Sequence, residues 1–267
     1  MPDQLDVCEA AARAGGRVLA DWRGRFGVSK KGQRDYVTEA DFAAQREIRR
    51  IVLTAFPEHG FVGEETLPDD EPDHDSASGL RWIVDPLDGT TNYVHGFPAY
   101  CVSVALARGD DLLVGAIYDP ERDECFTARA GGGGAFLNGR PIRVRETSDV
   151  LDALVALSFP PHVSVDSGAV ADFLAVVSHV HSVRRTGSTA INLAYIACGR
   201  LDAFWVRAIK SWDVAAGLLL VAEAGGAVGP FAGGPPGRVS LDRPVFIAAA
   251  TSALLERVRG LLPPEAV

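Results

Sequence analysis

Two aspartates at the end of an apolar strand are the residues best placed for chemistry in this chain. The run Trp82-Ile83-Val84 leads directly into Asp85-Pro86-Leu87-Asp88, so the two carboxylates stand three positions apart. The proline between them fixes φ and therefore the shape of the turn. Both carboxylates, together with the Leu87 carbonyl, can converge on a hard cation, which prefers oxygen ligands. The spacing therefore predicts a site for a divalent metal.

The next residues, Gly89, Thr90 and Thr91, are small and suit an anion. Their backbone N–H groups can point at one phosphate-like group, above all where a short helix begins at this position. The alternative interpretation is a simple turn in which Asp88 caps a helix. That alternative explains Asp88 but gives no reason for Asp85 or for the glycine-threonine step.

Three further acidic residues have both a structural and a functional interpretation. Glu64 follows the apolar run Phe61-Val62-Gly63, so its carboxylate lies either at a strand end, where sites are commonly built, or in a solvated turn. Asp213 opens an apolar helix, where it can serve as N-cap and still direct its second oxygen at a metal. Asp41 is the third helical residue after Thr38 and can complete a capping box, although Glu or Gln is the usual partner.

The composition is that of a folded, acidic protein. Its 267 residues are 47% hydrophobic, enough for a sizeable core, and carry a formal net charge of -9. Lys and Arg form only short pairs such as Lys30-Lys31 and Arg184-Arg185, which argues against a nucleic-acid partner. Excess carboxylate would also repel a small phosphorylated substrate. An acidic protein that acts on phosphates should therefore use divalent cations.

The cysteines and the N-terminal residues bear on the compartment. The four cysteines are scattered, without a Cys-x-x-Cys pair, so neither a zinc site nor a disulfide framework is predicted. Asp3 and Asp6 make the start of the chain unlike the basic start of a signal peptide. No apolar run approaches the roughly 18 residues that a membrane helix needs. We expect a cytoplasmic protein with no membrane partner.

Hydrophobic periodicity, caps and turn residues predict the elements that hold these side chains. We expect helices at about 5–22, 39–55, 169–179, 188–198, 213–224 and 254–262, and strands at about 80–84, 100–107, 112–118, 154–159 and 245–249. Turns are predicted at 108–111, at the glycines 131–134 and at Asn138-Gly139. A helix-and-strand first part followed by an alternating second part favours stacked layers over one doubly wound sheet.

Three segments in this order closely resemble the signature motifs of the inositol monophosphatase family: 63–65 (Gly-Glu-Glu), 85–92 (Asp-Pro-Leu-Asp-Gly-Thr-Thr-Asn) and 212–217 (Trp-Asp-Val-Ala-Ala-Gly). Segments 35–41 and 187–193 agree more weakly, and the resemblance spans about residues 5–260. It implies an α+β fold, an α/β/α/β/α sandwich of the sugar-phosphatase type. It also implies one catalytic unit, with an α+β half at about 1–148, an α/β half at about 149–267 and the active site between them, usually in a homodimer.

The resemblance further implies magnesium-dependent, lithium-sensitive hydrolysis of a phosphate monoester, with two to three Mg²⁺ ions in each site. One ion would be held by Glu64, Asp85 and the Leu87 carbonyl, and a second by Asp85, Asp88 and Asp213. A third, weaker ion would be held by Glu64 and waters near Asp41. Such metals lower the pKa of bound water and receive the leaving oxygen.

Catalytic and substrate-binding roles are implied in the same way. Thr90 and Asp41 would orient or deprotonate the attacking water, with Glu64 as the third catalytic residue. Lys30 or Lys31 would add positive charge nearby. The resemblance places these residues against the substrate: Asp88, Gly89, Thr90, Thr91, Gly187, Ser188, Val206, Arg207 and Asp213.

One position departs from the family pattern. Seven residues before the last metal-binding aspartate, inositol-preferring relatives usually carry a glutamate that contacts substrate hydroxyls, and this chain has Val206. Valine cannot accept those hydrogen bonds, so the preferred ester could shift. Arg207 could read an anionic group or be a surface charge. Myo-inositol monophosphate is the first expectation; histidinol phosphate, fructose 1,6-bisphosphate and a phosphoadenosine nucleotide are alternatives, and a non-catalytic partner in transcription or RNA processing is an alternative of another class.

Overall fold

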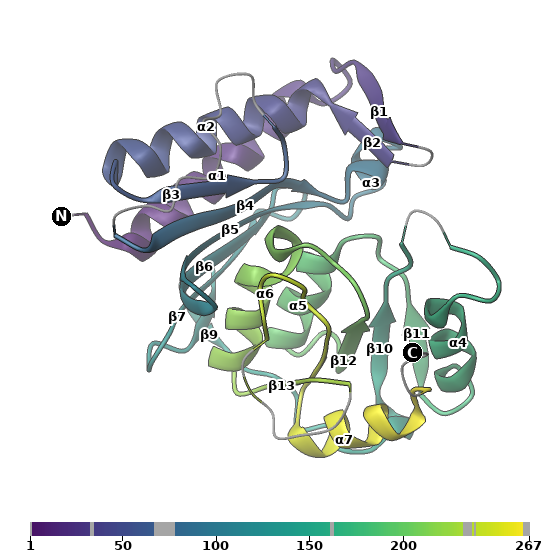
Figure 1. Ribbon diagram of the computed structural model, residues 1–267. Coiled ribbons are helices and arrows are strands. Elements are labelled where there is room, and N and C mark those ends of the chain that lie inside the picture. Colours follow the sequence, from purple (N-terminus) through teal and green to yellow (C-terminus); the bar gives the residue numbers. More distant parts are fainter. Residues whose placement is uncertain are drawn as a thin grey trace.

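The computed structural model has five alternating layers of helices and sheets (Figure 1). It describes residues 2–32, 35–66, 78–160, 163–231, 237 and 239–263, without the side chains of Lys30, Lys31 and Asp35. The predicted lysine near the site therefore lies outside the described side chains. The layering confirms the predicted α+β sandwich, which forms because each sheet has apolar faces that helices must cover.

The helices of the described chain are α1 (Gln4–Trp22), α2 (Glu39–Ala55), α3 (Thr90–Val94), α4 (Gly168–Val176), α5 (Thr189–Ala197), α6 (Ser211–Glu223) and α7 (Ser252–Leu261), with one 3₁₀ turn at Val150–Asp152. The first strands are β1 (Val28–Gly32), β2 (Asp35–Thr38), β3 (Gly60–Gly63), β4 (Leu80–Asp88), β5 (Cys101–Arg108), β6 (Asp111–Asp119), β7 (Glu124–Arg129), β8 (Ala135–Leu137) and β9 (Arg140–Ile142). The later strands are β10 (Leu154–Leu157), β11 (Ser182–Arg184), β12 (Ala203–Val206), β13 (Ala227–Gly229) and β14 (Phe246–Ala249).

The two large sheets divide the strands in chain order. β3 to β9 form a seven-stranded sheet in sequence order, and β10 to β14 form a five-stranded sheet in the order β11-β10-β12-β14-β13. Helices α1 and α2 cover one face of the first sheet, α5 and α6 fill the space between the sheets, and α7 covers the far face of the second (Figure 1). Along the described residues, no helix combines the length and apolar character needed to cross a bilayer.

Pairing of β3 with β4 is what brings two acidic segments together. This pair is parallel, with Gly63 opposite Val84, whereas β4 to β9 pair in antiparallel fashion. Because parallel strands end at the same edge, the residues that follow β3 lie beside the end of β4. There the register of β4 against β5 shifts between Asp85 and Asp88, so that Pro86-Leu87 forms a bulge. A bulge of this kind re-aims the side chains on either side of it.

Close packing of α6 holds the middle layer against its neighbours. A Cβ atom at Gly217 would lie 2.5 Å from the Leu193 side chain, and one at Gly115 would lie 3.0 Å from Ala216 Cα. Glycine is therefore required at Gly217 for α6 to approach α5 this closely. The N-terminus of α6, which carries Asp213, is fixed between the two sheets as a result.

Candidate metal and phosphate site

Glu64 and Asp85 meet at the edge where β3 and β4 end. The Glu64 N–H donates to the Val84 carbonyl at 3.1 Å, which continues the strand pairing by one residue. Asp85 follows Val84 and is 1% exposed, and its Oδ1 accepts a hydrogen bond from the Leu87 N–H at 2.9 Å. That contact closes the bulge and fixes the direction of the Asp85 carboxylate.

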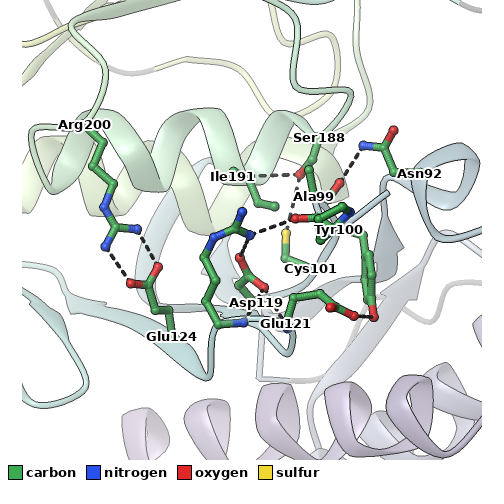
Figure 2. Close-up of polar contacts among 12 residues, drawn as sticks. Asn92, Ala99, Tyr100, Cys101, Asp119, Glu121, Glu124, Ser188, Ile191 and Arg200 are labelled. Carbon is green, nitrogen blue, oxygen red and sulfur yellow. Dashed lines mark hydrogen bonds and ion pairs between the residues drawn. The ribbon is translucent and has the colours of Figure 1, made fainter. Parts of the chain in front are cut away.

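Asp88 is held by the N-terminus of α5. Its Oδ2 accepts hydrogen bonds from Ser188 Oγ at 2.7 Å and from the Ala190 N–H at 2.6 Å. Ser188 is also the N-cap of α5, accepting from the Ile191 N–H at 3.2 Å (Figure 2). Both the N–H groups and the helix dipole favour a negatively charged oxygen at this point. One oxygen of Asp88 is thus fixed, which leaves the other to face a cation.

Asp213 reaches the same space from α6. We expected it to be the N-cap of this helix, and this was wrong by three positions. The cap position is Lys210, whose N–H donates to Asp213 Oδ2 at 3.2 Å, and Asp213 is the third helical residue. The helix begins earlier because Ser211 and Trp212 already have helical backbone. Carboxylate oxygens of Asp85, Asp88 and Asp213 lie within 4.8 Å of one another, a spacing that can hold a metal ion.

Burial and mutual repulsion raise the pKa values of these three aspartates. Burial is the largest cause for each, and the charges of neighbouring carboxylates, Glu64 among them, add to it. The pKa of Asp213 rises to about 8. For Asp88, burial outweighs the hydrogen bonds from α5 and raises the pKa to about 6, while that of Asp85 lies well above its ordinary value. Three ionised carboxylates this close together repel one another, and a bound cation would reduce that repulsion.

Thr90 and Asp41 come together from α3 and α2. The Thr90 hydroxyl lies 3.4 Å from Asp41 Oδ1 and 3.1 Å from the Leu87 carbonyl oxygen. Asp41 Oδ2 accepts from the Thr38 N–H at 2.9 Å and from its hydroxyl at 2.6 Å, which completes the predicted capping box. Asp41 therefore uses one oxygen in the cap of α2 and the other toward Thr90. Its structural and functional interpretations are compatible.

A left-handed glycine starts α3 next to this pair. Gly89 has φ 97°, and a Cβ atom there would lie 2.9 Å from the Ala99 carbonyl oxygen. Thr90 and Thr91 are the first helical residues, and the first N–H groups of a helix have no partner within it. The left-handed Gly89 thus ends β4 and begins α3 directly, and the first N–H groups of a helix can bind an anion.

The other residues predicted to contact substrate lie beside α5 and at the end of β12. Gly187 has φ 85° and packs against Asn92, next to Ser188. Val206 ends β12 and is 7% exposed, within the core between the sheets. Position 206 thus offers a hydrocarbon side chain and no hydrogen-bonding group.

Arg207 is occupied elsewhere. Its Nε and Nη2 donate to Asp172 at 2.8 and 2.6 Å, and Nη2 also donates to the Pro263 carbonyl at 2.7 Å. The guanidinium lies 4.5 Å from the centre of the Phe231 ring. These contacts make Arg207 an anchor between β12, α4 and the last residues described.

Sequence reasoning missed the thiol beside the cluster. Cys101 is buried, with Sγ 4.0 Å from Asp88 Oδ2. Figure 2 shows its second contact, in which Sγ lies 3.7 Å from Ser188 Oγ. The pairing register that sets Cys101 opposite Asp88 could have revealed it, but a bulge in β4 displaces that register and the sequence does not indicate its position. Ser103, two residues further along β5, makes a different contact. Its hydroxyl donates to the Trp212 carbonyl at 3.2 Å and links β5 to the start of α6.

Comparisons with known proteins identify the family and support the fold. Residues 2–263 match the model of the inositol monophosphatase family. An inositol-1-monophosphatase of Rhizobium meliloti is 43% identical over 226 residues, which cover 83% of each protein. The Nus factor SuhB of Pseudomonas aeruginosa is 37% identical over 273 residues, covering 99% of this chain and 98% of that one. The crystal structure of extragenic suppressor protein suhB from Bartonella henselae has a TM-score of 0.88 at 36% identity, covering 98% of both chains. The chain therefore belongs to the inositol monophosphatase family of phosphoric monoester hydrolases.

Proposed function

We propose that the protein hydrolyses a small phosphate monoester with Mg²⁺, and that myo-inositol monophosphate is the first substrate to test. The observation that carries the proposal is the convergence of Asp85, Asp88 and Asp213 within 4.8 Å, next to the Thr90–Asp41 contact. A cluster of carboxylates that can hold a metal, a hydroxyl–carboxylate pair and a helix N-terminus suit the three needs of the reaction. These are a cation, an oriented water and a phosphate cradle.

The donor set fits magnesium. All the candidate ligands are oxygens, and buried carboxylates with raised pKa values favour a cation that replaces their protons. We assign Glu64, Asp85 and the Leu87 carbonyl to one ion and Asp85, Asp88 and Asp213 to a second. A third would lie by Glu64 and Asp41, which gives two to three ions per site. When bound, such ions supply a water of lowered pKa and stabilise charge on the leaving oxygen.

The chain's own groups orient the reactants. Thr90 Oγ1 would accept a proton from the attacking water while its own proton passes to Asp41 Oδ1, which lies 3.4 Å away. The negative charge on Asp41 favours that transfer. N–H groups of Gly89, Thr90 and Thr91 would hold the phosphoryl oxygens. Asp88 and Asp213 would border the substrate while their second oxygens hold the cation. Gly187 and Ser188 would border it on the side of the second half.

Val206 bears on which ester is used. An aliphatic side chain gives no hydrogen bond to a substrate hydroxyl, so discrimination among polyol phosphates should be weak at this position. Histidinol phosphate, fructose 1,6-bisphosphate and a phosphoadenosine nucleotide are therefore tested beside inositol 1-phosphate.

Phosphate release from this panel, with Mg²⁺ and with a chelator, tests the proposal. We expect release from at least one ester in Mg²⁺, none in chelator, and inhibition by lithium. Asp88→Asn should abolish most turnover with the fold retained, because it removes a charge that the cation needs. Normal rates in chelator, or near-normal rates for Asp88→Asn, would contradict the metal assignment.

A second function of another class has one observation in its favour. The relative from Pseudomonas aeruginosa that covers 99% of this chain is named a Nus factor. A role as a binding partner in transcription or RNA processing would show as association with such a complex and no turnover of any ester. We also propose that the protein is a homodimer, and light scattering of the purified protein measures its oligomeric state.

A further inference from the structure

Asn92 lies inside α3, two residues after Thr90, and its side chain binds two segments that are far apart in the sequence. Its Nδ2 donates to the Ala99 carbonyl at 2.6 Å and to the Thr186 carbonyl at 2.8 Å. Figure 2 shows the amide directed at Ala99. Ala99 belongs to the loop that leads into β5, whereas Thr186 belongs to the turn before α5. One planar amide, with its two N–H donors, thus fastens α3 both to its own sheet and to the second half.

The turn that Asn92 contacts is the same turn that holds the metal ligand Asp88. Thr186 Oγ1 donates to Asn192 Oδ1 at 2.8 Å and accepts from the Ser188 N–H at 3.2 Å, so the turn is internally braced. Two residues further, Ser188 and Ala190 donate to Asp88 Oδ2. Residues 88–92 are therefore attached to residues 186–190 at both ends.

Gly187 shows how closely the two segments fit. With φ 85°, a Cβ atom at Gly187 would lie 2.8 Å from Asn92 Nδ2 and 3.1 Å from its Oδ1. A side chain at position 187 would push Asn92 away from the Thr186 carbonyl. The separation of the segments is set by direct contact, and it does not depend on long flexible side chains.

We propose that Asn92 is a positioning residue for phosphate transfer: it fixes the N–H groups of residues 89–91 relative to Asp88 by tying α3 to the 186–190 turn of the second half. This inference rests on the proposed function of the same site. Asn92 is not itself assigned a contact with substrate or metal. Without its amide, the short α3 helix keeps Gly89 and Thr90 but loses the contact that fixes its tilt. A displacement of about 1 Å at reacting groups can lower a rate by roughly 10²-fold.

Asn92→Ala and Asn92→Asp test the proposal, with Arg200→Gln as the matched control. Arg200 makes a separate link between the halves, because its Nη2 donates to Glu124 Oε1 at 2.6 Å near the other end of α5 (Figure 2). All three variants remove one inter-half contact, but only Asn92 borders the phosphate turn. Alanine leaves two carbonyls without the amide, and aspartate also places a negative charge against both. Asn92→Ser, which keeps one donor, should recover part of the loss.

We expect kcat to fall about 30- to 100-fold in Asn92→Ala and further in Asn92→Asp, as for a misplaced reacting group. The Mg²⁺ concentration for half-maximal rate should change less than about threefold, because the ligands stay in place. Inhibition by inorganic phosphate should weaken. Arg200→Gln should lower thermal stability by a similar amount to Asn92→Ala yet keep kcat within about twofold.

The proposal is overturned if Asn92→Ala keeps kcat within threefold of the wild type, or if Arg200→Gln loses as much. Hydrogen–deuterium exchange of residues 88–95 gives a readout that does not depend on turnover. Faster exchange there in Asn92→Ala, and not in Arg200→Gln, supports the positioning role of Asn92. It does so even if the wild type hydrolyses no ester, because absence of turnover would reject the proposed function alone. Unchanged exchange in Asn92→Ala rejects the positioning role of Asn92. If Asn92→Ala does not fold, Asn92→Ser decides by the same two measurements.

Discussion

At the residue scale, the site gathers carboxylates in a largely buried place. Three aspartates lie with carboxylate oxygens within 4.8 Å of one another, and Asp85 is 1% exposed. Burying an unpaired charge costs several kcal/mol, and like charges add to that cost. The folded state tolerates the arrangement because the surrounding elements are well packed. Binding of a cation then offsets the repulsion, which couples affinity for metal to the stability of the fold.

Asp213→Asn should therefore stabilise the metal-free protein while it removes most activity. The pKa of Asp213 is about 8 in the folded state against an ordinary 3.8, so its favourable contribution to folding is present below about pH 4 and is lost as the pH rises toward 8. Asparagine has no charge to repel Asp88. We expect a gain on the order of 2 kcal/mol at pH 8 and a smaller one at pH 5. Thermal unfolding with chelator measures both; a variant no more stable than wild type at pH 8 would contradict the repulsion.

Gly89→Ala tests the turn that presents the phosphate-binding N–H groups. Gly89 and Gly96 both have positive φ, but a Cβ at Gly89 would lie 2.9 Å from the Ala99 carbonyl oxygen, whereas nothing lies within 4 Å of one at Gly96. Both alanine variants should lose about 1 kcal/mol for the left-handed backbone. Gly89→Ala should in addition lose at least about 10²-fold in kcat/KM, since α3 must shift. Equal kcat/KM values of the two variants would show that activity does not depend on the backbone conformation at Gly89.

At the element scale, helices carry most of the ligand placement. Asp88 points at the N-terminus of α5, and Asp41 and Asp213 are both third residues of their helices, α2 and α6. At that position a carboxylate accepts from the N–H of the cap residue and still has a second oxygen available. The first turn of a helix is thus used three times to fix one oxygen of a carboxylate and free the other.

Ser188→Ala should weaken metal binding through this arrangement. The change removes the 2.7 Å hydrogen bond to Asp88 together with the cap of α5. Ser167 caps α4 in the same way through the Val170 N–H and touches none of these carboxylates, so Ser167→Ala is a matched control. Both variants should lose about 1 kcal/mol of stability. Only Ser188→Ala should raise the Mg²⁺ requirement, by about 10-fold, as titration of activity or of heat would measure.

How far the elements could be predicted depends on their length and on their signals. The long helices α1 and α2 and the central strands β4 to β6 were predicted within a few residues, because caps and periodicity extend over many positions. Strands of three to five residues, such as β1, β11 and β13, were missed, since so short a run carries no periodicity. The acids of the site were recognised one by one from local context. Their convergence depends on the bulge in β4 and on α6 crossing to the first sheet, which local pattern does not encode.

At the scale of the whole molecule, the candidate ligands come from two layers, the first sheet and the helices between the sheets. Asp85 and Asp88 belong to β4 of the first sheet, and Asp213 belongs to α6, which packs against both sheets. A cation held by all three would connect elements that are more than a hundred residues apart in the sequence. Its binding should stabilise the entire fold, with a free energy that rises with the ratio of metal concentration to Kd.

The stabilisation by Mg²⁺ should depend on pH in a direction fixed by the aspartates. Their raised pKa values, about 6 for Asp88 and about 8 for Asp213, mean that protons compete with the metal below these values. We expect the rise in Tm at a fixed Mg²⁺ concentration to be small at pH 5.5, to grow through pH 7 and to level off above about pH 8.5. Asp213→Asn removes one of these titrations, so its remaining response should depend less steeply on pH between pH 7 and pH 8.5. Thermal shift measured from pH 5.5 to 9 checks both curves, and a Mg²⁺ effect independent of pH would mean that the ion binds elsewhere.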